Sequence, residues 1–119
     1  MAQLDYAEAQ KRLNTSENDL LAMLGADLTS KQALPLQPAQ LIERGQRWLM
    51  AQYSDLQSFV CASDNIKTFA LAKNDDAEIV VEIAKLIAGI VLPVNPIIVS
   101  VLIVKRGLKS FCESSWSEQ

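Results

Sequence analysis

The chain has 119 residues, of which 50% are apolar and 6% are aromatic, and its 11 basic and 14 acidic residues give a formal charge of −3. This length is typical of one domain with one hydrophobic core. Because the sequence has no histidine and only two cysteines, it excludes imidazole catalysis and a structural zinc site with four Cys or His ligands.

Residues 1–34 are predicted to form an N-terminal helical corner. Tyr6, Ala9 and Leu13 share one face of a first helix, and Ser16 is a suitable N-cap for a second helix over residues 16–24. Gly25 is a natural residue for ending that helix.

The corner has the spacing of a helix-turn-helix, which suggests DNA binding as one alternative. Its second helix, however, begins with the polar and acidic residues Glu17, Asn18 and Asp19. The chain also lacks the concentrated positive surface that nucleic acids require. DNA binding is therefore the weakest of the functions considered, and no nucleic-acid partner is expected.

A long amphipathic helix is predicted over residues 38–61, after a connection over residues 25–37. Pro38 fits the first helical position, where its missing N–H costs nothing. Apolar residues then recur at helical spacing, namely Ile42, Leu49, Tyr53, Leu56 and Val60. A short helix over residues 65–72 follows a break at residues 62–65, and it is expected to bury Ile66, Phe69 and Leu71.

Residues 76–112 are predicted to form a hydrophobic helical hairpin. Its segment Leu86–Val104 has no charged residue, and a turn at Pro93-Pro96 divides it into two helices. The first helix is expected to run to Leu92, with a thin polar line formed by Glu78, Glu82, Lys85 and Gly89. In this line Glu82 and Lys85 are expected to be a partly exposed pair.

The return helix is expected over residues 96–112. Its apolar positions recur at spacings of 4, 3, 4 and 3 beyond the charged Lys105 and Arg106, and they are Ile97, Val101, Val104, Leu108 and Phe111. This continuity favours a buried core helix. The alternative is a membrane element, because the uncharged run has nearly the ~20 residues of a bilayer span; its two prolines and the charged Glu82 and Lys85 weigh against that alternative.

Taken together, these patterns predict an all-α fold: a compact bundle of about five helices, forming a single domain over residues 1–119 and ending in the hydrophobic hairpin. No arrangement of nucleophile, base and acid stands out, so we expect no enzyme, no catalytic or metal site and no cofactor. Cys61 and Cys112 are expected to be reduced thiols in a cytoplasmic protein, since the N-terminus does not resemble a signal peptide. A Cys61–Cys112 bridge is conceivable, but no pattern in the sequence argues for it.

The sequence therefore predicts a non-catalytic interaction protein, such as an adaptor or a small regulatory subunit, that binds another chain or itself through helical surfaces. The alternative is a small membrane-active protein, holin-like or effector-like, whose hairpin over residues 76–112 inserts into a bilayer and makes the chain membrane-associated. The candidate interface residues are aromatic or lie on the return helix, and core packing is an equally good explanation for all of them: Trp48, Tyr53, Val101, Leu108, Phe111 and Trp116.

Overall fold

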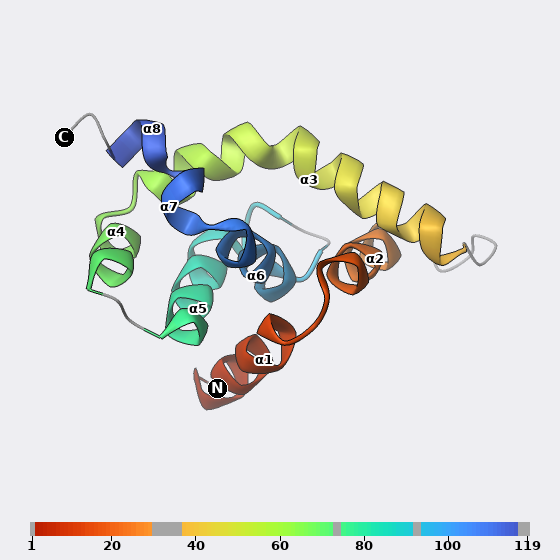
Figure 1. The fold of residues 1–119 in the computed structure, drawn as a ribbon, viewed down its shortest axis with the longest axis horizontal. Helices are drawn as coiled ribbons and strands as arrows, with labels where there is room; N and C mark the ends of the chain where they lie inside the picture. The colour runs from red at the N-terminus through yellow and green to blue at the C-terminus, as the bar shows by residue number, and fades with distance from the viewer. Residues whose placement is uncertain (1, 30–36, 73–74, 92–93, 117–119) are drawn as a thin grey trace.

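The computed structural model describes residues 2–29, 37–72, 75–91 and 94–116, and every regular element in these ranges is a helix (Figure 1). The all-α prediction is confirmed. The helices are α1 (Ala2–Leu13), α2 (Glu17–Leu28), α3 (Pro38–Cys61), α4 (Asp64–Leu71), α5 (Asp76–Ile87), α6 (Pro96–Arg106), α7 (Leu108–Phe111) and α8 (Glu113–Trp116). The described ranges thus hold more helices than the five expected, because the C-terminal part is divided into short pieces.

Polar side chains at the starts of several helices explain where those helices begin. Ser16 accepts a hydrogen bond from the backbone N–H of Asp19 and caps α2, as predicted. Ser63 caps α4 and Asp75 caps α5 in the same way. At α6, the Asn95 side chain accepts from the N–H of Ile97 and Pro96 occupies the first turn. Each cap satisfies an amide that the helix itself leaves unpaired.

Helix α6 lies in the middle of the molecule, with α1, α2 and α5 packed around it (Figure 1). All seven residues from Ile97 to Ile103 are buried, and the hydroxyl of Ser100 donates to the carbonyl of Pro96. A helix that is apolar on every side needs cover on every side. No helix in the described ranges is both long enough and apolar enough to cross a bilayer.

Helices α2 and α3 form the most extensive helix pair, and glycines allow them to approach closely. The expectation that Gly25 ends the second helix is wrong, because α2 continues through it to Leu28. Gly25 is buried against the backbone of Leu41. The absence of a side chain there serves packing between helices and not helix termination.

Three further sequence expectations fail in the second half of the chain. Helix α5 ends at Ile87, several residues before Leu92. The return helix is interrupted at Gly107, whose φ of 104° lies in the left-handed region that favours glycine. Leu71, expected to be buried, is 57% exposed at the end of α4. Of the predicted turn at Pro93-Pro96, Pro93 lies outside the described residues.

Candidate functional site

Polar side chains do not gather into a reactive centre in the part of the chain that the structure describes. No group of three or more Cys, Asp or Glu residues there is arranged to hold a metal ion. Glu82 and Lys85 form an i,i+3 ion pair of 3.6 Å on the polar side of α5, as the spacing predicted. Such a partly exposed pair contributes little to stability and has no evident chemical role.

Tyr6 and Asp75 form one long-range polar contact between α1 and the start of α5. The Tyr6 hydroxyl donates to a carboxylate oxygen of Asp75. This hydrogen bond, with partial desolvation and the negative charges of Asp75 and Glu78, raises the pKa of Tyr6 above its ordinary value of 10.0. The contact joins α1 to the residue that caps α5.

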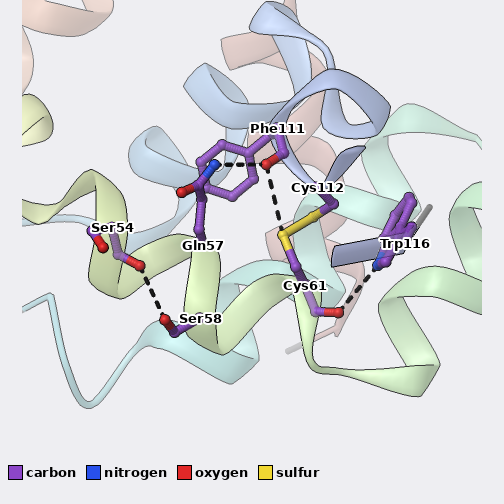
Figure 2. Close-up of a disulfide and its surroundings, with 7 residues drawn as sticks. All are labelled: Ser54, Gln57, Ser58, Cys61, Phe111, Cys112 and Trp116. Atoms are coloured by element: carbon purple, nitrogen blue, oxygen red, sulfur yellow. Dashed lines mark hydrogen bonds between the residues drawn. A yellow bond between two sulfur atoms is a disulfide. The ribbon is translucent and has the colours of Figure 1, made fainter. Parts of the chain in front are cut away.

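The two cysteines form a disulfide that joins the end of α3 to the C-terminal segment (Figure 2). Cys61 and Cys112 are 51 residues apart in sequence, and both are buried. The expectation of two reduced thiols is therefore wrong. Disulfides persist in oxidising compartments, so the cysteines no longer argue for a cytoplasmic location.

Residues 107–116, which we call the strap, lie along the C-terminal half of α3 around this disulfide (Figure 1). The Gln57 side chain donates to the carbonyl oxygen of Phe111 at 2.8 Å. The indole N–H of Trp116 donates to the carbonyl oxygen of Cys61 at 3.1 Å. Figure 2 shows these contacts on either side of the sulfur atoms, so the strap is held at several points.

The structure divides the predicted interface residues into two groups. Val101, Leu108 and Phe111 are at most 7% exposed and belong to the core of this chain. Trp48 and Trp116 are partly buried against that core, while Tyr53 is 37% exposed. Tyr53 and Phe111 meet edge to face with ring centroids 4.9 Å apart. Tyr53 and Phe111 are therefore brought together by a contact within one chain, whereas Trp116 donates its hydrogen bond to the Cys61 carbonyl.

A second apolar surface was not singled out by the sequence. Phe59 of α3 is 48% exposed and Ile90, just after α5, is 44% exposed. These two side chains line a surface hollow of about 240 Å³ together with Leu56, Val91, Gln52 and Asp55. Ile90 follows the end of α5 at Ile87 and is left at the surface. We call Phe59, Ile90 and this hollow the apolar surface.

No protein-family model matches the chain, and no curated protein or solved structure matches it either. The function is therefore argued from its own residues.

Proposed function

We propose that this chain is a non-catalytic interaction protein, an adaptor or small regulatory subunit, that binds a partner protein through the apolar surface. The observation that carries the proposal is the pair Phe59 and Ile90, two large apolar side chains exposed on the same hollow. Large aromatic and aliphatic groups beside a concave surface are typical anchors of protein interfaces.

The lining of the hollow indicates which partner would fit. Apolar atoms of Leu56 and Val91 form its floor, and Asp55 and Gln52 supply its polar rim. An apolar side chain of the partner would lose contact with water there, while a neighbouring lysine or arginine would pair with the Asp55 carboxylate. We therefore propose a partner segment with an apolar anchor beside a basic residue.

The two alternatives have less support. Insertion of the hairpin over residues 76–112 into a bilayer would require α6 to leave a site in which Ile97–Ile103 are all buried, and the Cys61–Cys112 bond ties the following segment to α3. DNA binding through α2 would use a helix whose Leu20, Leu21 and Leu24 are committed to the core. The leading residue of that helix, Glu17, is paired with Arg106.

The experiment compares the assembly state of the full chain with that of its variants, each purified under non-denaturing conditions from the cells that naturally produce the protein. Light scattering and native mass spectrometry should find it in a defined complex, or as an oligomer if the partner is a second copy. Ile90→Asp should dissociate that complex at least about tenfold more readily, because it places a charge in the hollow. Leu71→Asp is the matched control, since Leu71 is also an exposed large aliphatic residue but lies on α4, outside the hollow. A monomer in those cells, or a complex that Ile90→Asp leaves unchanged, would contradict the proposal.

A further inference from the structure

The strap is a separate piece of structure joined to the body of the fold at Gly107. This glycine has a φ of 104°, and α6 ends there. The helices within the strap, α7 and α8, have four residues each. Isolated helices of this length are unstable in water, so the strap keeps its shape only while it is held against the rest of the chain.

Most of the strap's recorded polar contacts with the body reach the second half of α3. The Phe111 carbonyl accepts from Gln57 and the Trp116 indole donates to the Cys61 carbonyl (Figure 2). The Phe111 ring also meets the Tyr53 ring of α3 edge to face. The Cys61–Cys112 bond is the one covalent link among these contacts. It holds the strap close to α3 and so keeps the weaker contacts together.

The strap borders a small pocket between α3 and α6 that is partly open to solvent. The pocket has a volume of about 80 Å³, and its lining includes Leu49 and Tyr53 of α3, Leu102 of α6, and Gly107 and Phe111 of the strap. The strap therefore leaves a gap against α3 and α6 beside Gly107.

Most of the buried apolar residues lie outside the strap. Of the 28 buried apolar residues in the described ranges, the strap supplies only Leu108, Phe111 and Cys112. The other 25 come from α1 to α6 and the connections near them. Loss of the strap would therefore remove one edge of the core and leave its centre in place.

Both cysteines of the disulfide are buried, with Cys112 0% exposed and Cys61 7% exposed. Cys61 is the residue of the pair that keeps some contact with solvent, so we take its side of the bond as the point of attack by a thiolate. Its attack on Cys61 Sγ breaks the disulfide and releases Cys112 as a thiolate, which then takes up a proton.

We propose that the Cys61–Cys112 bond is a redox latch on the strap. One thiolate of a dithiol reductant attacks the Cys61 sulfur, forms a mixed disulfide with it and expels Cys112. The second thiol of the reductant then attacks the reductant's sulfur atom in this mixed disulfide. This step frees Cys61 and leaves the reductant as a cyclic disulfide. The two electrons come from the dithiol. The freed strap leaves α3 by rotation about Gly107, and the body from α1 to α6 stays folded. This inference does not depend on the apolar surface proposed above.

The test is native reduction of the full oxidised chain with dithiothreitol, followed by hydrogen exchange and thiol counting. Mass spectrometry after maleimide labelling should find two new thiols. Amide exchange should accelerate by about tenfold or more within residues 108–116, while α2, α5 and α6 keep their protection. Removal of the reductant and reoxidation should restore the original exchange pattern.

Two single-tryptophan variants provide a matched pair of fluorescence reporters. Trp48→Phe leaves Trp116 in the strap as the reporter, and Trp116→Phe leaves Trp48 on α3. On reduction, the emission maximum of Trp116 should move to longer wavelength and that of Trp48 should stay unchanged. The emission wavelength is the readout, because a nearby disulfide quenches intensity whether or not the strap moves. If either variant fails to fold, the exchange data from the unmodified chain decide alone.

Three results would overturn the latch. The first is a bond that dithiothreitol does not open in the folded protein. The second is a reduced protein whose strap keeps its protection. The third is exchange that accelerates throughout the chain, with red shifts from both reporters, because the bond would then hold the whole fold together and not the strap alone.

Discussion

A Cβ atom placed on Gly25 would lie 2.0 Å from the carbonyl oxygen of Leu41. The same relationship recurs one turn away, where a Cβ on Gly45 would lie 2.1 Å from the carbonyl oxygen of Leu21. Each helix thus offers one glycine to the backbone of the other, and the two contacts are four residues apart along α2 and along α3. The two glycines set the distance at which these helices cross.

Gly25→Ala is expected to destabilise the protein by about 3 kcal/mol, because the added methyl overlaps backbone that no rotamer change can move. Gly89→Ala is the matched control, since a Cβ there meets nothing within 4 Å. Its free energy of unfolding should stay within about 0.5 kcal/mol of the original. Urea denaturation measures both. An equal effect of the two substitutions would show that the crossing tolerates a wider spacing.

Leu102→Ala should lower the free energy of unfolding by about 2–5 kcal/mol, since Leu102 is fully buried in α6 and its truncation leaves a cavity. Leu86→Ala makes the same chemical change at a position that is 38% exposed. That control should cost about 1 kcal/mol or less. Similar losses at the two positions would contradict the central placement of α6.

Asn95 connects the start of α6 to two other helices, and its replacement tests that connection. Its Oδ1 accepts from the Ile97 N–H, its Nδ2 donates to Glu8, and its backbone N–H donates to Asp27. Asn95→Ala should cost about 1–2 kcal/mol through the lost cap. Asn95→Ser keeps a capping oxygen and loses only the donor to Glu8. Its thermal unfolding temperature should therefore lie between those of the original chain and of Asn95→Ala. A serine variant as unstable as the alanine variant would assign the effect to the Glu8 contact.

The raised pKa of Tyr6 predicts a contribution to stability that disappears in alkali. Its folded-state pKa lies above the ordinary value of 10.0, chiefly because it donates to Asp75. The contribution is therefore complete below pH 10 and is lost as the pH rises through the folded-state pKa. In a Tyr53→Phe background, ultraviolet titration should place the Tyr6 ionisation above its ordinary value. Asp75→Asn should move it back towards that value, and no movement would contradict the assignment.

Local patterns in the sequence predict most of the helices, because capping and periodicity are local properties. Ser16, Ser63 and Asn95 each stand where a helix begins. The helix predicted over residues 38–61 has the same bounds as α3. In these segments, local preference and tertiary packing favour the same structure.

The failures of prediction come from contacts between residues far apart in the sequence. Gly25 was expected to end a helix, but its role is set by Leu41 on another helix. The pairing of Cys61 with Cys112 depends on the strap lying on α3, which no local pattern encodes. Phe59 and Ile90 are neighbours only because α3 passes the end of α5. The spacing of apolar residues did not predict that these two side chains are exposed, because spacing alone does not show whether an apolar face is buried.

The most direct test of the proposed interaction is site-specific photo-crosslinking from the apolar surface in living cells. A photoreactive phenylalanine analogue at position 59 should give one discrete adduct, whose linked peptide in the partner contains an apolar residue beside a lysine or arginine. Asp55→Asn should weaken that adduct, and the same analogue at position 71 should give none. No adduct from position 59, or equal adducts from positions 59 and 71, would contradict the proposal that this surface binds a partner.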